Sequence, residues 1–577
     1  MIDLKDIHSP KDIKNLTTGE LTTLSGELRK VLLDKLAAHG GHVGPNLGVV
    51  EAAVALHYVF NAPEDKIVFD VSHQSYVHKM LTGRIGAFLD PKHYNDVTGY
   101  TCPRESDYDL FEIGHTSTSI SLATGLAKAR DLKGEKYNVV AFIGDASLGG
   151  GEALEGLDYA PELGTNFIVV LNDNQMSIAE NHGALYDHLT ALRESKGTSE
   201  NNIFKALGYD YIYVRDGNDV ASLVKAYEKA KDADHAVLIH INTMKGNGFA
   251  PAEANKERFH YSAPFSETDG ALLNVSSQKS YTDIFTEHML KRMGADGNVV
   301  TLTAGTPGAI GFTPDKRHIA GKQFVDVGIC EQDAVAMAAG LAKGGAKPVF
   351  GVMATFVQRA YDQLSHDVSI NCLHVTVVDF GGGVFGIPDM THLGFFDISM
   401  ISNIPGIKFL APATKEEYVA MIDYALDSCD GPVVVRTPGG GVVSTDVPVN
   451  TDFNRYDIVE QGADVAIIAE GPFLQTAKQA AGILRGKGIN PTVINPRILS
   501  SVDSETLDGL RNYRKVITVE DGIVDGGFGQ KVAAYFGSSP VQVICLGLKK
   551  EFLDRYNVGE VLKANSLTPE QIAALAE

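Results

Sequence analysis

A carboxylate and an amide stand at the ends of two neighbouring predicted strands. An apolar run at Asn138–Ile143 leads into Asp145, and a second run at Phe167–Leu171 leads into Asn174. The 174 − 145 = 29 residues between them suit a strand–helix–strand unit of about 30 residues, whose strand ends meet at one edge of a sheet. With a nearby main-chain carbonyl, these oxygens are hard ligands suited to Mg²⁺. An Asp that only caps a helix is an equally good reading of this motif alone.

Glycines follow the first of these strands, at Gly149–Gly151, before a helix predicted from about Glu152. Glycine lets main-chain N–H groups approach phosphate oxygens at the start of a helix. The open coordination positions of a bound Mg²⁺ also suit a diphosphate. The motif therefore indicates a site for a metal-bound diphosphate.

A second glycine pattern, Gly381–Gly386, fits the GxGxxG spacing and follows a predicted strand. The next residues, Ile387–Asp389, do not open the helix that a dinucleotide-binding fold needs. We therefore reject a nicotinamide site here.

Val- and Ile-rich runs that alternate with helical segments position these residues. We predict strands at Asn138–Ile143, Phe167–Leu171, Ala236–Ile241, His374–Val378, Val433–Val435, Val465–Ala469 and Lys515–Val519. This pattern is typical of α/β domains with mainly parallel sheets. Polar stretches at about Pro251–Ser280 and Gly439–Tyr456 have the composition of connections. We therefore expect three α/β domains, at residues 1–270, 278–445 and 455–577.

The composition narrows the classes of partner. With 50 basic and 72 acidic residues, the net charge of the 577-residue chain is 50 − 72 = −22, which argues against nucleic acid and anionic membranes. The 5 cysteines form no CxxC pair, so we expect reduced thiols without a disulfide framework or zinc site. No run approaches about 18 uninterrupted apolar residues, and we expect a cytoplasmic protein.

Several further blocks resemble, in order, those of a known enzyme family. Gly144-Asp145 followed by Asn174 resembles the thiamine diphosphate motif, although Ala146 replaces its third glycine. The other blocks are Gly40–His42, Asp70–Tyr76, Gly114–Ser119, Lys245–Phe249, Asp326–Gln332 and Thr355–Gln363. Over nearly its whole length the chain resembles the transketolase-like 1-deoxy-D-xylulose-5-phosphate synthase family. The resemblance implies a transketolase-like fold that binds thiamine diphosphate and Mg²⁺.

The resemblance also assigns the cofactor site. It implies that Asp145, Asn174 and the Met176 carbonyl hold the metal and that Phe356 stacks on the pyrimidine ring. The other implied cofactor contacts are His73, Gly114, His115, Thr116, Gly144, Ala146, Ser147, Lys245 and Phe249, the last standing where the family has a tyrosine.

Glu331 is the candidate for cofactor activation. It follows a predicted strand at Gln323–Val327 and opens a predicted helix at Gln332–Lys343. The resemblance implies that its carboxyl hydrogen-bonds N1′ of the aminopyrimidine. A carboxyl held against a ring in a dry cleft should have a raised pKa and donate a proton. The alternative is that Glu331 has no catalytic role and lies in the first turn of the helix because the helix dipole favours a carboxylate there.

The two substrates of this family must gain and lose protons near neutral pH, and imidazole groups can transfer those protons. By their flanking sequences the candidate catalytic histidines are His42, His73, His260 and His392. The resemblance further implies substrate contacts from Tyr361, Asp389 and Arg436.

The chain departs from the family at the acceptor end of the site. Phe380 stands where the family has an arginine in Asp-Arg-Ala-Gly, and Gly439 where it has the second arginine of Arg-Tyr-Pro-Arg-Gly. Arg436 is the arginine that remains, and Asp389 matches only approximately. The segment after Ser177 is also shorter than in most members. These differences weaken the expected contacts with an acceptor phosphate.

The implied reaction transfers the two-carbon unit of pyruvate, with decarboxylation, to the aldehyde acceptor D-glyceraldehyde 3-phosphate. The products are 1-deoxy-D-xylulose 5-phosphate, a precursor of isoprenoids and thiamine, and CO₂. The resemblance implies a homodimer. Two alternatives stay open: a related thiamine diphosphate ketol transferase or acyloin-forming enzyme with a different acceptor, including an unphosphorylated one, and a paralogue that binds cofactor without turnover.

Overall fold

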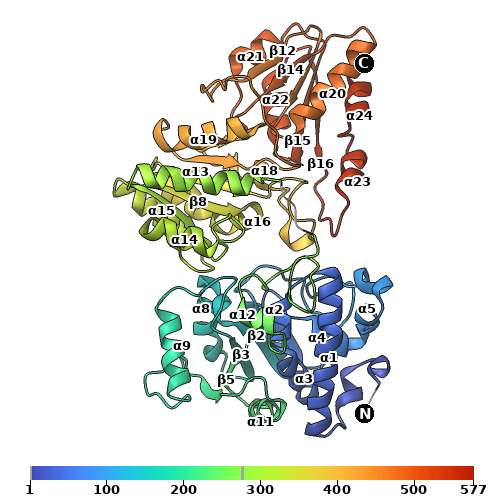
Figure 1. Cartoon of the computed structure of the whole chain (residues 1–577), viewed down its shortest axis with the longest axis vertical. Coiled ribbons are helices and arrows are strands. Elements are labelled where there is room, and N and C mark those ends of the chain that lie inside the picture. Colours follow the sequence, from blue (N-terminus) through green and yellow to red (C-terminus); the bar gives the residue numbers. More distant parts are fainter. Residues whose placement is uncertain (1–2, 275–277) are drawn as a thin grey trace. The chain divides into compact units, whose positions relative to one another are not determined.

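The computed structural model describes residues 3–274 and 278–577. The chain forms two compact units (Figure 1). The first comprises the residues before Gln278 together with Gly328–Cys330, and the second comprises Gln278–Val327 and Glu331–Glu577. The first unit contains one β-sheet and the second contains two.

The sheet of the first unit has five parallel strands in the order β1-β2-β3-β5-β4. The strands are β1 (Lys66–Phe69), β2 (Val139–Gly144), β3 (Phe167–Asp173), β4 (Asp210–Val214) and β5 (Ala236–Asn242). Every residue of β3 is buried, as expected for a central parallel strand that helices cover on both faces.

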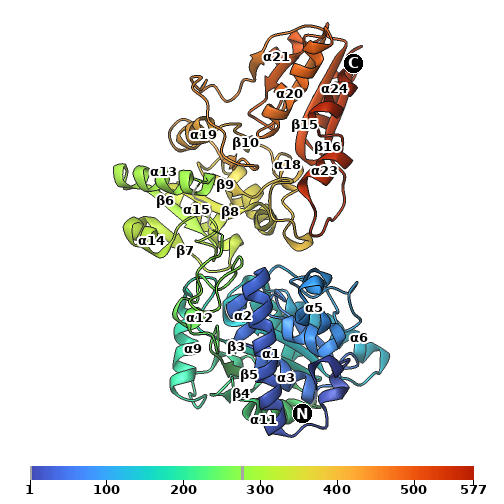
Figure 2. The same ribbon diagram turned by 45° about the vertical axis from the view of Figure 1, so that its right-hand side comes forward.

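Two hydrophobic cores lie on the two faces of this sheet. Helices α1 (Thr18–His39), α3 (Val50–Val59) and α11 (Val220–Ala230) pack on the face that carries Val140 and Ile168 (Figures 1 and 2). The other face packs against α6 (Ser119–Lys133), α8 (Gly151–Tyr159) and α9 (Ala184–Glu194). Shorter helices are α2 (Val43–Leu47), α4 (Tyr76–Lys79), α5 (Gly86–Leu89), α7 (Asp145–Leu148), α10 (Ile203–Ala206) and α12 (Ala250–Ala254).

The first sheet of the second unit has six parallel strands in the order β10-β11-β9-β8-β6-β7. They are β6 (Val299–Thr303), β7 (Phe324–Asp326), β8 (Lys347–Met353), β9 (Thr376–Phe380), β10 (Lys408–Leu410) and β11 (Val433–Arg436). The helices are α13 (Tyr281–Ala295), α14 (Pro314–Ala320), α15 (Glu331–Lys343), α16 (Ala354–Val357), α17 (Tyr361–Gln363), α18 (Asp397–Ile401) and α19 (Lys415–Asp427). After β9 the next helical turn is Met390–His392, so no helix follows Gly381–Gly386, as predicted.

The last sheet has the strand order β12-β14-β13-β15-β16. Its strands are β12 (Asp457–Glu460), β13 (Val465–Ala469), β14 (Thr492–Asn495), β15 (Lys515–Ile523) and β16 (Gln542–Leu548). The helices are α20 (Phe473–Gly486), α21 (Ser504–Gly509), α22 (Phe528–Phe536), α23 (Val558–Ala564) and α24 (Pro569–Ala576). Only β12 among these described strands pairs in the antiparallel sense.

The predicted class, α/β domains with mainly parallel sheets, is confirmed, whereas the exact domain boundaries remain a prediction. No helix in the described part of the chain is long and apolar enough to cross a membrane.

Candidate active site

Asp145 opens α7 directly after β2. Its side chain is buried, with the residue 1% exposed, and Oδ2 accepts a hydrogen bond of 2.9 Å from Asn181 Nδ2. Burial, helped by the neighbouring Asp173, raises the pKa of Asp145 to about 7. A divalent cation would supply the positive charge that this buried carboxyl lacks.

Asn174 follows β3, the strand beside β2, and the register pairs Gly144 with Asn172. The Asn174 side-chain oxygen accepts a hydrogen bond of 3.1 Å from the main-chain nitrogen of Met176. Gln175 between them has a left-handed φ of 64°, so these three residues form a tight turn at the same sheet edge as Asp145.

This edge offers a mixed set of metal ligands. The described residues contain no cluster of three or more His, Cys, Asp or Glu side chains that could hold a metal. A cation here would rely on one carboxylate, one amide oxygen and one main-chain carbonyl, which is an oxygen set suited to Mg²⁺.

A buried network that the sequence did not reveal lies behind this edge. The Asp173 carboxylate accepts hydrogen bonds from His240 Nε2 at 2.8 Å and from Arg193. The Tyr211 hydroxyl lies 2.7 Å from His240 Nδ1. Burial opposes ionisation of Asp173, but the hydrogen bond from His240 and the charge of Arg193 lower its pKa overall. The only signal in the sequence was the position of Asp173 between two asparagines.

The loop with His115 and Thr116 is fixed by Asp70 at the end of β1. The Asp70 carboxylate accepts hydrogen bonds from the main-chain nitrogens of Ser117 at 2.8 Å and Ser119 at 2.9 Å. Ser117 Oγ donates to the Ser147 carbonyl at 2.8 Å, and a Cβ on Gly150 would overlap with Ser117 Oγ. The loop therefore contacts the glycine segment after β2, which brings together the two predicted phosphate-binding segments.

Three of the four predicted catalytic histidines lie together in the first unit. The ring centroids of His42, His73 and His260 lie 5.1 to 5.8 Å apart. The rings of Tyr100 and Tyr261 contact His42. Burial, together with the charge of the nearby Lys245, lowers the pKa of His260 well below its usual value, so this imidazole is neutral at physiological pH.

Lys245 lies against this histidine cluster and is 1% exposed. Its Nζ donates to the Ser177 carbonyl at 2.5 Å and lies 3.1 Å from His260 Nδ1. Burial lowers the pKa of Lys245 to about 7, although the charge of Asp145 opposes that shift. Phe249 packs in an apolar cluster with Phe259 and Phe265.

In the second unit, Glu331 is the first residue of α15 and is 2% exposed. Its Oε2 has no hydrogen-bond partner among the described residues, and Arg359 Nη1 lies 3.8 Å from it. Burial raises the pKa of Glu331. A buried carboxyl with a raised pKa and an oxygen without a hydrogen bond fits a ligand ring nitrogen as its partner.

Phe356 and His392 lie together at an edge of the six-stranded sheet. Their ring centroids are 5.6 Å apart in an edge-to-face arrangement. The Asp389 carboxylate accepts from the Thr391 main-chain nitrogen at 2.9 Å and lies 3.3 Å from His392 Nδ1. The Tyr361 hydroxyl donates to Asn403 at 2.8 Å.

Arg436 ends β11 and is 4% exposed. Its guanidinium forms ion pairs with Asp397, Glu470 and Asp521. These three carboxylates come from separate parts of the chain, and the sequence did not predict their meeting.

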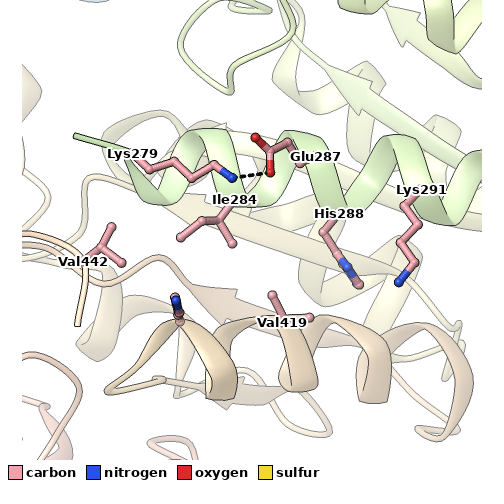
Figure 3. A pocket seen from close by; sticks show the side chains of 8 residues that line it. Lys279, Ile284, Glu287, His288, Lys291, Val419 and Val442 are labelled. Atoms are coloured by element: carbon pink, nitrogen blue, oxygen red, sulfur yellow. Dashed lines mark hydrogen bonds and ion pairs between the residues drawn. The ribbon is translucent and has the colours of Figure 1, made fainter. Parts of the chain in front are cut away.

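A hollow of about 370 Å³ lies between α13 and α19 (Figure 3). Lys279 Nζ lies 2.6 Å from Glu287 Oε2 there. His288 and Lys291 lie on the same helix as Glu287, α13. None of the predicted site residues lines this hollow, so it is separate from the candidate site.

Matches to family models define the class of the protein. A model described as 1-deoxy-D-xylulose-5-phosphate synthase matches residues 4–201 and 194–243. The transketolase pyrimidine-binding domain matches residues 277–442, and the transketolase C-terminal domain matches residues 455–572. The chain is therefore a transketolase-type transferase, of a class that depends on thiamine diphosphate and Mg²⁺.

Full-length relatives identify the family. A 1-deoxy-D-xylulose-5-phosphate synthase of Pelotomaculum thermopropionicum is 40% identical, over 99% of this chain and 96% of the relative. One of Symbiobacterium thermophilum is 39% identical, over 100% of this chain and 94% of the relative. A solved transketolase from Campylobacter jejuni is 17% identical, covers 97% of this chain and 99% of its own, and has a TM-score of 0.46. The chain belongs to the 1-deoxy-D-xylulose-5-phosphate synthase family.

Proposed function

We propose that this chain decarboxylates pyruvate and transfers the remaining two carbons to D-glyceraldehyde 3-phosphate. The products are 1-deoxy-D-xylulose 5-phosphate and CO₂. The observation that carries the proposal is Glu331, a buried carboxyl at the start of a helix whose Oε2 has no hydrogen-bond partner among the described residues. Membership of the family supports the same reaction.

Two sets of residues would hold the cofactor. Asp145, Asn174 and the Met176 carbonyl would bind Mg²⁺, and the loop fixed by Asp70 would present main-chain N–H groups to the diphosphate. When bound, thiamine diphosphate supplies the nucleophilic carbon and the electron sink for decarboxylation. Glu331 would hold its proton against the pyrimidine N1′, while Phe356 offers a ring face.

The histidine cluster would handle the oxygen atoms of the substrates. A neutral imidazole can donate one hydrogen bond and accept another. With its lowered pKa, His260 would act as a neutral donor to a substrate oxygen. His42 and His73 lie within reach of the same position, because their rings contact that of His260.

The direct experiment follows CO₂ release and the sugar phosphate product by mass spectrometry, with pyruvate, D-glyceraldehyde 3-phosphate, thiamine diphosphate and Mg²⁺. Glu331→Gln should lose turnover and keep cofactor binding. The matched control is Glu560→Gln, the same change in the first turn of α23 at an exposed position. Full turnover by Glu331→Gln would refute the assignment, and a wild-type chain that binds cofactor without releasing CO₂ would be a non-catalytic paralogue.

We also propose that the enzyme is a cytoplasmic homodimer. All 5 cysteines are free thiols, which suits a reducing compartment, and the dimer is what the family resemblance implies. Light scattering at micromolar concentration should give twice the chain mass of 61.9 kDa. A monomer that is fully active would contradict the dimer.

A further inference from the structure

We propose that the acceptor end of this site does not recognise a phosphate group, so that unphosphorylated hydroxyaldehydes serve as acceptors at least as well as D-glyceraldehyde 3-phosphate. This inference rests on the proposed two-carbon transfer from pyruvate and concerns the class of acceptor. It is carried by the contacts of the two arginines, Arg359 and Arg436, that lie on the strand ends and segments of the same sheet as Phe356 and His392 in the second unit.

Three parallel strands bring the relevant residues to one edge. The register pairs Arg436 of β11 with Asp379 of β9, and Asp379 with Val352 of β8. Helix α16, which carries Phe356, follows β8. The segment that carries Asp389 and His392 follows β9. Within the second unit, the strands that would present cations to an acceptor held near His392 are β8, β9 and β11, with the segments that follow them.

Those segments carry almost no positive charge. Residues 381–407, after β9, contain no Lys or Arg, and neither do residues 437–454, after β11. Between β8 and β9 the one basic Lys or Arg side chain in the sequence is Arg359, which lies 3.8 Å from Glu331. Lys531 of α22 reaches the first of these segments, where its Nζ donates to Ser402 Oγ at 2.7 Å. Arg436, at the end of β11, is the other cation that these strand ends carry.

The guanidinium of Arg436 is already occupied by carboxylates of the chain. Nε lies 2.5 Å and Nη2 3.2 Å from the two oxygens of Asp397. Nη1 pairs with Asp521 and lies 3.5 Å from Glu470. Because a phosphate is bound through the same planar set of N–H donors, it would have to displace these buried ion pairs.

A further buried carboxyl, that of Asp379, makes binding of an anion at this cluster less favourable. Asp379 is buried beside Arg436 in the register, and neither of its carboxyl oxygens has a hydrogen-bond partner among the described residues. Burial and the neighbouring Asp397 raise the pKa of Asp379 well above its usual value. Burial likewise raises the pKa of Asp397 and of Glu470. Protons remove part of the negative charge, but they release none of the Arg436 donors.

Two glycines leave room for the carboxylates of this cluster to pack directly against Arg436. A Cβ on Gly382 would overlap with Asp397 Oδ2 and come within 2.7 Å of Arg436 Nε. Gly383 has a left-handed φ of 65°, and a Cβ there would overlap with the Asp521 carboxylate. The two glycines after β9 therefore allow the carboxylates to approach Arg436 closely.

The two positions at which the family has arginine, Phe380 and Gly439 in this chain, supply no other cation for a phosphate. Phe380 is 3% exposed and packs against Phe285, with ring centroids 5.2 Å apart. A Cβ on Gly439 would overlap with Phe385. One position is thus part of the core, and the other is covered by an aromatic ring.

The test compares acceptors on the wild-type holoenzyme, with saturating pyruvate, thiamine diphosphate and Mg²⁺. A bidentate arginine–phosphate contact would favour a phosphorylated acceptor by about tenfold to a hundredfold. We expect kcat/KM for D-glyceraldehyde and glycolaldehyde to equal or exceed that for D-glyceraldehyde 3-phosphate, within about threefold. A preference of about tenfold or more for the phosphorylated aldehyde, which is the lower end of what such a contact would give, would overturn the inference.

A variant separates a role of Arg436 in binding from a role in structure. Arg436→Met should change KM for D-glyceraldehyde and its 3-phosphate by the same factor, because neither acceptor uses the guanidinium. A selective rise in KM for the 3-phosphate would overturn the inference. Inorganic phosphate with the wild-type holoenzyme should not compete with the aldehyde, and this measurement decides the question even if the variant does not fold.

The same assays distinguish failure of the inference from failure of the proposed function. CO₂ release from pyruvate that depends strongly on the phosphorylated aldehyde would overturn the inference alone. If pyruvate releases no CO₂ with any aldehyde, both statements fail.

Discussion

Lys245 Nζ lies 3.1 Å from His260 Nδ1 in a partly buried contact. When Lys245 is protonated, its ammonium has donors and no acceptor, so Nδ1 of His260 then accepts and the single imidazole proton lies on Nε2. The lysine therefore fixes which face of His260 can donate to a substrate oxygen. Its other contact, with the Ser177 carbonyl, holds the ammonium in place.

Replacing Lys245 by Met should release this constraint. We expect kcat to fall by about a hundredfold, the scale of one positioned proton donor, with part of the His260 population changing to the Nδ1–H form. Nitrogen-15 NMR of histidine-labelled enzyme would show the tautomer directly. Lys229→Met, an exposed change on α11, is the control. An unchanged tautomer in Lys245→Met would contradict this role.

Glu331→Gln should become relatively more stable as the pH rises. Burial raises the folded pKa of Glu331 above its ordinary value of 4.5, so above that pH the folded state holds a proton that the unfolded state has lost. The unfolding free energy of the wild type then falls with increasing pH, and Gln does not titrate. Thermal unfolding without cofactor should therefore show the difference in Tm, variant minus wild type, growing from pH 5 to pH 8. A difference that shrinks would mean that Arg359 stabilises an ionised Glu331.

Asp70→Asn should loosen the loop that it holds. The amide can accept from one of the Ser117 and Ser119 nitrogens but presents a donor to the other, which leaves a buried N–H unpaired. We expect a loss of about 1–3 kcal/mol in the free energy of unfolding and weaker binding of thiamine diphosphate. Urea unfolding and calorimetric titration would measure the two effects. Asp90→Asn is the control, because Asp90 is exposed and accepts only a local hydrogen bond from Lys92.

Removal of the metal should abolish cofactor binding. Chelation with EDTA should release thiamine diphosphate, and added Mg²⁺ should restore it in the wild type but not in Asp145→Ala. Asp158→Ala, an exposed change in α8, should behave like the wild type. Equal affinity of Asp145→Ala and wild type for thiamine diphosphate at the same Mg²⁺ concentration would remove Asp145 from the metal site.

Local patterns in the sequence predicted the parts of the site that depend on short-range order. The predicted strand ends at Asp145 and Asn174 are real and adjacent, because a parallel strand–helix–strand unit fixes them. The start of α15 at Glu331 agrees with the predicted helix. Both features lie within one element or one crossover, where spacing alone is informative.

The carboxylates around Arg436 could not be predicted in this way. Asp397, Glu470 and Asp521 are separated by 73 and 51 residues, and they meet only when two sheets of the second unit pack. Strand β12 was also not predicted, since it is short, largely exposed at Ile458 and Val459, and antiparallel to its neighbour. Its residues carry neither the apolar run nor the alternation that reveals a strand.

Packing at positions 380 and 439 limits the substitutions that this protein can accept. An arginine at position 439 must first displace Phe385, and one at position 380 must first leave the core beside Phe285. No single substitution at either position offers a solvated guanidinium, so each first step lowers stability before it can bring any new contact. An arginine at either position would therefore require coordinated replacements of the aromatic side chains that pack there.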